Sequence, residues 1–156
     1  MSRKAAGGRW PDIAGRLIDD GHVLPVRVYF EDTDFSGTVY HASYLRFMER
    51  GRSDYLRCLG VGHRALADGA EGEPLSFTVR RMEIEFMKPA RIDDLVEVET
   101  RPLEVEGARM ILGQRILLQS ETLVSAEVTV AVVNGDGRAR RIPKSIRALV
   151  AARGRP

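Results

Sequence analysis

The feature that most limits the fold is a single long amphipathic segment, residues 42–59, followed by a succession of strand-like stretches. Apolar residues recur in it at helical spacing and charged residues fill the other side, which predicts one helix. Gly51 interrupts this helix, and a mid-helix glycine costs up to ~1 kcal/mol relative to alanine. We therefore expect another backbone to pack closely against Gly51. Gly60 is suited to end the helix.

Most of the remaining chain carries strand signals. A first strand is expected over residues 23–30, with Pro25 near an edge or an irregularity. The other predicted elements are a short helix at residues 63–67 and four strands at residues 75–86, 95–100, 108–119 and 122–133. The alternation of apolar and polar residues changes phase at Arg80 and Arg81, which indicates a β-bulge. Residues 134–137, Asn-Gly-Asp-Gly, are a strong turn signal.

One strand, one long helix and four consecutive strands predict an α+β fold in which an antiparallel β-sheet wraps around a long central helix. We expect one domain over residues 22–150, preceded by an arm of uncertain order at residues 1–21 and followed by a basic tail at residues 151–156. Such a sheet exposes an edge strand, and formation of a dimer would bury it.

Composition excludes several classes of protein. The formal charge of +2 over 156 residues does not favour a nucleic-acid binder. Basic residues crowd the last 19 residues, where they either meet an anion or form a solvated tail. No apolar run approaches the ~20 residues of a membrane span, and no signal peptide is visible.

The single cysteine, Cys58, lies in an apolar run and is expected in the core. One cysteine cannot form an intramolecular disulfide, so we expect a reducing, cytoplasmic location. His22 and His63 lack histidine, cysteine or carboxylate partners at ligand spacing in the sequence, so no metal site is predicted.

The loop at residues 29–41 carries the chemistry. It places Asp34 and His41 within a few residues of a predicted helix N-terminus. A carboxylate can attack a carbonyl or activate water, and helical amide N–H groups can stabilise the developing negative charge. This arrangement suits hydrolysis at an activated carbonyl, so the chain is interpreted as a small enzyme.

Asp34 has a structural alternative, because an aspartate before a helix is often a cap or a turn residue. Asp32 competes for the same role, and the sequence alone leaves both open. If Asp34 is catalytic, it is either a nucleophile that forms a mixed anhydride or a general base. The candidate oxyanion donor is the backbone N–H of His41, whose side chain orients water, binds Asp34 or contacts substrate.

The runs at residues 27–34, 37–44 and 47–50 closely resemble the hotdog-fold acyl-CoA thioesterases of the YbgC and 4-hydroxybenzoyl-CoA thioesterase group. The similarity is greater to the YbgC branch, which is often associated with the Tol-Pal system, and extends over residues 24–145. Several YbgC-like members have tyrosine where this chain has Phe30, so any role of that hydroxyl is absent here.

The resemblance implies a hotdog fold, a homodimer or homotetramer with active sites at subunit interfaces, and hydrolysis of an acyl-CoA thioester to a carboxylic acid and free CoA. It places the catalytic aspartate at Asp34 and the helix-start amide at His41. No cofactor is implied beyond the CoA thioester substrate. The resemblance also gives substrate-binding candidates: Gly37, Tyr40 and Tyr44 at the pocket, and Arg109, Arg138, Arg140 and Arg141 for the CoA phosphates.

Two other functions compete with this interpretation. The basic surface would dock an acidic acyl carrier protein if the substrate were a carrier-protein thioester. From a different class, the chain would be a non-catalytic sensor of acyl ligands or an adaptor in envelope assembly. Retention of Asp34, Gly37 and His41 favours an enzyme.

Overall fold

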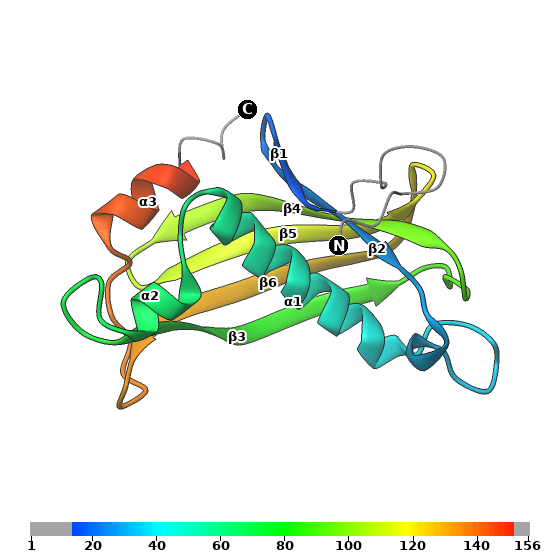
Figure 1. The fold of residues 1–156 in the computed structure, drawn as a ribbon, viewed down its shortest axis with the longest axis horizontal. Coiled ribbons are helices and arrows are strands. Elements are labelled where there is room, and N and C mark those ends of the chain that lie inside the picture. The colour runs from blue at the N-terminus through cyan, green and yellow to red at the C-terminus, as the bar shows by residue number, and fades with distance from the viewer. Residues whose placement is uncertain (1–13, 152–156) are drawn as a thin grey trace, which may run out of the picture.

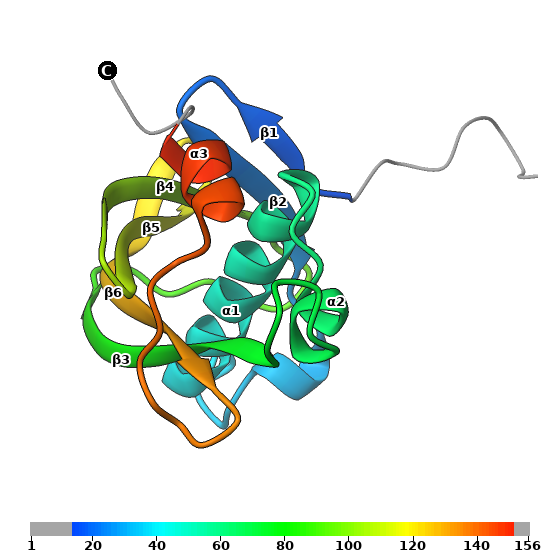
Figure 2. The same cartoon turned by 90° about the vertical axis from the view of Figure 1, so that its left-hand side faces the viewer.

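The computed structural model describes residues 14–151, in which a six-stranded antiparallel sheet curves around one long helix (Figures 1 and 2). The strand order is β1-β2-β4-β5-β6-β3. In chain order the elements are β1 (Arg16–Ile18), β2 (Gly21–Arg27), the 3-10 turn η1 (Phe30–Asp32), α1 (His41–Cys58), α2 (His63–Ala67), β3 (Leu75–Phe86), β4 (Leu95–Glu106), β5 (Arg109–Leu118), β6 (Glu121–Asn134) and α3 (Lys144–Ala151). The predicted α+β architecture is confirmed.

Helix α1 lies across the concave face of the sheet and buries its apolar side there. Phe47, Met48 and Tyr55 are fully buried among the inward-facing residues of the sheet. A Cβ atom on Gly51 would lie 2.7 Å from Cγ1 of Val98 on β4. Gly51 therefore permits a close approach as expected, but its nearest neighbour is a side chain of the sheet rather than another backbone.

The first strands differ from the prediction in their bounds. Residues 16–18, assigned to an arm of uncertain order, form β1 and pair with residues 21–23 of β2. Pairing of β2 with β1 ends at Val23, so Pro25 has a strand neighbour on one side only, Glu97 of β4. The missing N–H of Pro25 therefore leaves no gap in the sheet. Strand β2 ends at Arg27, three residues before its predicted end, and Phe30 already belongs to η1. Residues 1–13 and 152–156 lie outside the described residues.

Strand β3 forms one edge of the sheet and pairs only with β6. Its register shifts between Val79 and Arg81, which confirms the predicted bulge. A second shift, between Pro102 and Glu104, lets β4 continue to Glu106, six residues past its predicted end. Because β3 has no neighbour on its outer side within residues 14–151, its edge is available for pairing.

The C-terminal region holds a helix that the sequence analysis did not predict. Ile146 and Val150 of α3 are buried, and the helix packs against β4. This part of the basic region is therefore not a solvated tail. The expectation that Cys58 lies in the core is also wrong, because its side chain is exposed at the end of α1. Within residues 14–151 no helix has the length and apolar character to cross a membrane.

Candidate active site

Asp34 lies in a tight turn between η1 and α1. Its Oδ1 accepts a hydrogen bond from the backbone N–H of Ser36 at 2.8 Å and another from the Ser36 hydroxyl. The turn is closed by Gly37 N–H, which donates to the Asp34 carbonyl at 3.0 Å, and Gly37 adopts a φ of 80° that glycine accommodates without strain. The Asp34 carboxylate is thus fixed by residues of its own turn.

The electrostatic surroundings favour the charged form of Asp34. Hydrogen bonds from the side chain and the backbone of Ser36, together with the nearby His41, hold the pKa of the Asp34 carboxyl below its usual value of 3.8. The side chain is fully exposed to solvent. Asp34 is therefore an ionised carboxylate at neutral pH, as a nucleophile or a general base must be.

The neighbouring acid has a different role. The Asp32 side chain is buried, and its Oδ2 accepts a hydrogen bond from Tyr29 N–H at 2.9 Å. The Asp32 carbonyl also accepts from Tyr40 N–H at 2.8 Å, which holds the start of α1 against η1. Asp32 is thus committed to the structure of the loop.

His41 is the first residue of α1, and Tyr40 precedes it in an extended conformation as the N-cap. No side chain caps this helix, and the first N–H groups of any helix lack intrahelical acceptors. The His41 ring contacts Tyr40, with ring centroids 4.5 Å apart, and approaches Phe86 at 6.1 Å. Unused amide donors and an imidazole therefore lie beside the Asp34 turn.

A shallow cavity of about 220 Å³ opens at this helix start. His41, Tyr44 and Phe86 line it, together with the segment after β3. The Tyr44 hydroxyl accepts a hydrogen bond from Ala90 N–H at 2.9 Å, so it is committed to holding that segment in place. Tyr44 thus forms a wall of the cavity, whereas Tyr40 is half exposed outside it.

The four arginines proposed for CoA do not reach this cavity within one chain. Arg109 lies at the start of β5 on the sheet face away from α1, 3.5 Å from Glu104. Arg140 pairs with Glu73 at 2.8 Å, while Arg138 and Arg141 are exposed in the segment after β6. That segment and the Asp34 turn occupy opposite ends of the molecule (Figure 1).

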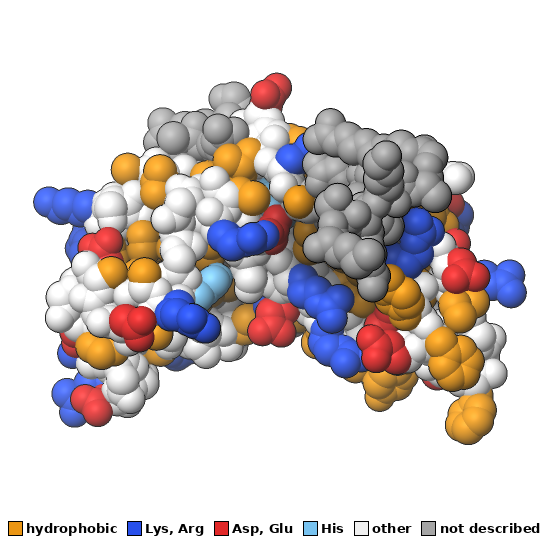
Figure 3. Space-filling model, in the orientation of Figure 1, with side chains coloured by type: hydrophobic (Ala, Val, Ile, Leu, Met, Phe, Trp, Pro, Cys, Tyr) orange, Lys and Arg blue, Asp and Glu red, His pale blue; other side chains and the backbone are white. Residues whose placement is uncertain are grey.

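Hydrophobic side chains gather at the end of the molecule that carries the Asp34 turn (Figure 3). Tyr29, Phe30 and Phe35 flank Asp34 and are all largely exposed. Elsewhere on this face positive and negative side chains are interspersed, as the nearly balanced composition predicts.

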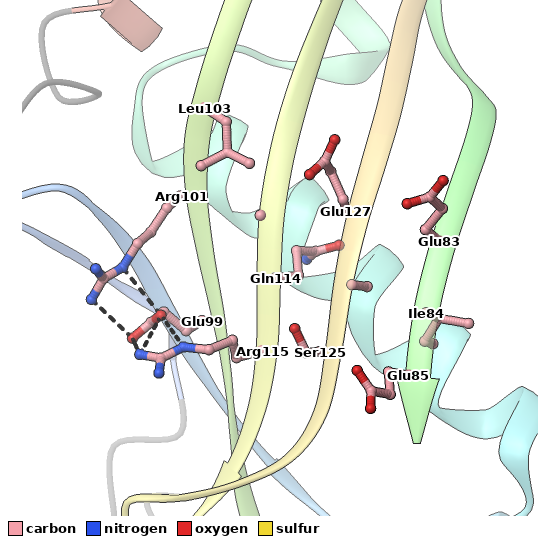
Figure 4. Close-up of a pocket in the computed structure, with 12 residues that line it drawn as sticks. Glu83, Ile84, Glu85, Glu99, Arg101, Leu103, Gln114, Arg115, Ser125 and Glu127 are labelled. Carbon is pink, nitrogen blue, oxygen red and sulfur yellow. Dashed lines mark hydrogen bonds and ion pairs between the residues drawn. The ribbon is translucent and has the colours of Figure 1, made fainter. Parts of the chain in front are cut away.

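Two larger hollows lie away from Asp34. One of about 410 Å³ is a depression in the sheet face opposite α1, where Glu83, Glu85 and Glu127 face an ion-paired group in which Arg115 binds Glu99 (Figure 4). The other, of about 430 Å³, lies between α1, α2 and β3 and is lined in part by Arg52, whose pKa is lowered by burial. Neither contains Asp34 or His41.

Sequence reasoning missed two contributors to this site. Ser36, the strongest partner of Asp34, was visible as the D-x-S pattern of an Asx turn. Phe86 was predicted only as a strand residue, because nothing in the sequence shows that the end of β3 meets the start of α1.

Comparison with known proteins places this arrangement in a family. The sequence profile of the thioesterase superfamily matches residues 36–125. The acyl-CoA thioesterase YbgC of Haemophilus influenzae is 41% identical over 133 residues, covering 85% of this chain and 96% of that protein. The acyl-CoA thioester hydrolase YbgC of Escherichia coli is 43% identical over 124 residues, covering 78% of this chain and 90% of that protein.

A solved structure agrees with these relatives. The crystal structure of a probable thioesterase from Bartonella henselae matches with a TM-score of 0.77 at 50% identity, covering 79% of this chain and 99% of that chain. Profile, relatives and fold coincide over most of the sequence. The chain belongs to the thioesterase superfamily, in its YbgC-like branch, and is a thioester hydrolase with the hotdog fold.

Proposed function

We propose that this enzyme hydrolyses acyl-CoA thioesters to a carboxylic acid and free CoA. The observation that carries the proposal is an ionised Asp34 held beside the unpaired amides of the α1 N-terminus. The relatives named above act on acyl-CoA, which supports CoA as the carrier.

Asp34 supplies the attacking oxygen in one of two ways. As a nucleophile it forms a mixed anhydride with the acyl group, which water then hydrolyses; as a general base it takes a proton from the attacking water. A thiolate is a good leaving group, so neither route requires a strong acid at the sulfur.

The backbone N–H of His41 is the proposed oxyanion donor. It lies in the first turn of α1, where N–H groups have no intrahelical acceptor. A single donor of this kind typically contributes ~3–4 kcal/mol to transition-state stabilisation. The His41 side chain, facing the cavity beside Tyr44, orients water or contacts the substrate.

We infer that a second copy of the chain completes the site. The cavity at His41 is small and open, and the aromatic residues around Asp34 are exposed. A partner chain would cover the cavity and these aromatic residues. It would also supply the four candidate arginines for the CoA phosphates, because the arginines of one chain do not reach its own cavity. The proposed assembly is a homodimer or homotetramer, and the single cysteine favours the cytoplasm.

The test is release of free thiol from a panel of acyl-CoA and acyl-carrier-protein thioesters. Asp34→Asn preserves the shape of the side chain but removes its charge, and we expect it to abolish turnover. Asp19→Asn is the matched control, because Asp19 is exposed in the turn between β1 and β2, outside both the Asp34 loop and the arginine-bearing segment after β6. The control should retain full activity.

Each outcome assigns a function. Selective turnover of CoA thioesters that is lost in Asp34→Asn supports the proposal. Preferred turnover of carrier-protein thioesters would instead identify acyl carrier protein as the carrier of the acyl group. Full activity in Asp34→Asn would remove Asp34 from the mechanism. No turnover across the panel, from a folded oligomer, would favour a sensor or adaptor.

A further inference from the structure

A group of metal-ligand side chains lies at the C-terminal end of α1, far from Asp34. His22, Asp54 and Cys58 each direct one donor atom into a common space, and these three atoms lie within 4.8 Å of one another. His41 and Asp54 are 13 residues apart on α1, roughly 20 Å at the helical rise. The group is therefore separate from the proposed active site.

The helix explains how two of these ligands meet. Asp54 and Cys58 are four residues apart on α1, a spacing that places both side chains on the same helix face. Sγ of Cys58 lies 3.7 Å from Oδ2 of Asp54. The third ligand, His22 at the start of β2, is brought in by the sheet, and its Nε2 lies 2.7 Å from the same Oδ2.

The three partners were not visible in the sequence. His22 is 32 residues from Asp54, so a search for ligands at short spacing around His22 misses both the carboxylate and the thiol. His22 has no such partner at ligand spacing in the sequence, but the fold brings Asp54 and Cys58 to it.

We propose that His22, Asp54 and Cys58 bind one divalent transition-metal ion, with Zn²⁺ as the preferred ion. Imidazole nitrogen, carboxylate oxygen and thiolate sulfur are the zinc ligands of proteins. Around a tetrahedral zinc, such atoms lie about 3.3–3.6 Å apart, given the usual bond lengths. The Asp54–Cys58 separation nearly matches, and the His22–Asp54 contact needs to open by roughly 0.6 Å.

A fourth donor is available from the backbone. The Gly15 carbonyl lies 3.8 Å from Sγ of Cys58. A Cβ atom on Gly15 would lie 1.9 Å from Oδ2 of Asp54 and 2.4 Å from Nε2 of His22. Only glycine lets the chain pass this close to the ligand atoms, so the fourth position is taken by the Gly15 carbonyl or by water.

The charges around the group are compatible with a dication. Asp54 uses its other oxygen, Oδ1, to bind the exposed Arg57, which leaves Oδ2 directed at His22 and Cys58. The buried His22 directs Nε2 at this same Oδ2, so the imidazole nitrogen faces the space between the carboxylate and the thiol. The carboxylate and a thiolate together balance the two positive charges of the metal.

The proton balance gives the proposal a signature. Without metal, His22 Nε2–H donates to Asp54; Nδ1 of the same ring has no hydrogen-bond partner within the described residues. Metal binding at Nε2 displaces this hydrogen, and zinc binds cysteine as the thiolate. Binding of Zn²⁺ is therefore expected to release protons.

The test uses the full chain, freed of metal with a chelator and titrated with ZnCl₂ against a chromophoric zinc indicator. We expect one Zn²⁺ per chain and, by calorimetry in buffers of different ionisation enthalpy, release of protons on binding. Cys58→Ser should weaken binding about tenfold or more and reduce the proton release. Co²⁺ should give a thiolate charge-transfer band with the wild type and none with Cys58→Ser.

Two further variants keep the result decisive. Cys58→His keeps a ligand at this surface position and should bind within about tenfold of the wild type. His63→Gln removes a histidine outside the group and should leave binding unchanged. The proposal is overturned if the metal-free wild type takes up no Zn²⁺, or if Cys58→Ser binds as tightly as the wild type.

Discussion

At the scale of single residues, Asp34 is held by its neighbours in the chain. Ser36 makes the hydrogen bonds that contribute most to lowering its pKa. These bonds favour the carboxylate, so the acid limb of the wild-type kcat/KM profile is expected below pH 3.8. Protonation of Asp34 below that pH should abolish activity.

Ser36→Ala removes the hydroxyl donor and should raise the pKa of Asp34 toward its usual value. The acid limb then moves to higher pH, while activity at pH 7 still has an ionised Asp34. The measurement is kcat/KM against pH, with folding followed by circular dichroism at each point. Ser145→Ala, at the exposed start of α3, is the control and should leave the profile in place. Coincident profiles for Ser36→Ala and the wild type would show that another group governs the limb.

Gly51 sets how closely α1 approaches the sheet. Gly51→Ala gains up to ~1 kcal/mol of helix propensity, but its Cβ would lie 2.7 Å from Val98. Overpacking typically costs 1–3 kcal/mol, so we expect a net loss of about 1 kcal/mol in the free energy of unfolding. Urea unfolding measures it, with Gly135→Ala, where a Cβ meets nothing within 4 Å, as the control. Stabilisation by Gly51→Ala would contradict this account of the packing.

At the scale of elements, α3 closes one end of the domain. Ile146 is 4% exposed and Leu149 is 39% exposed on the same helix. Ile146→Ala should therefore destabilise the protein by about 2–4 kcal/mol, the range for a buried large-to-small change. Leu149→Ala, the matched control, should cost much less. Equal shifts in the thermal midpoint for the two variants would mean that α3 does not pack as described.

Elements were predictable where one periodicity extends over many residues. The amphipathic pattern located α1 to within one residue at each end, and the phase change at Arg80 located the bulge in β3. The same reasoning missed α3, because its eight residues span only about two helical turns and lie in an arginine-rich region that was interpreted by its charge. It also failed for Cys58, since an apolar run at a helix end does not show which residue faces the core.

The candidate site was predictable only in its contiguous part. Asp34 and His41 lie in one loop, so the sequence displays their proximity. Phe86, at the end of β3, is brought to His41 only by the fold. In the same way, the packing of α1 against β2 brings Asp54 to His22. Contacts between residues so far apart in sequence depend on topology and register, which residue spacing does not reveal.

At the scale of the whole molecule, the unpaired edge of β3 is the proposed surface for a second copy. Val79 is exposed at this edge. A buried lysine at the centre of an interface is unfavourable, so Val79→Lys should lower the mass of the oligomer. Light scattering after size-exclusion chromatography measures that mass.

Leu103→Lys is the comparison for this experiment, because Leu103 is exposed on the sheet face away from α1 (Figure 4). If the edge is the interface, Val79→Lys dissociates the oligomer to single chains. Dissociation to single chains by Leu103→Lys, with Val79→Lys unchanged, would assign the interface to the sheet face and reject the edge.

The bulge in β3 allows the curvature of the strand to change independently of the side on which its residues face. Arg80 is one residue more than the ladder with β6 requires, and the bulge absorbs it so that Phe86 still faces α1. Removing Arg80 would restore regular pairing and leave Phe86 on the same side, but the strand would lose its local bend. A one-residue change in length at this point therefore alters the curvature of the edge without changing which side chains line the cavity. Insertion or loss of one residue here can therefore reshape the sheet edge while the wall of the cavity at His41 stays the same.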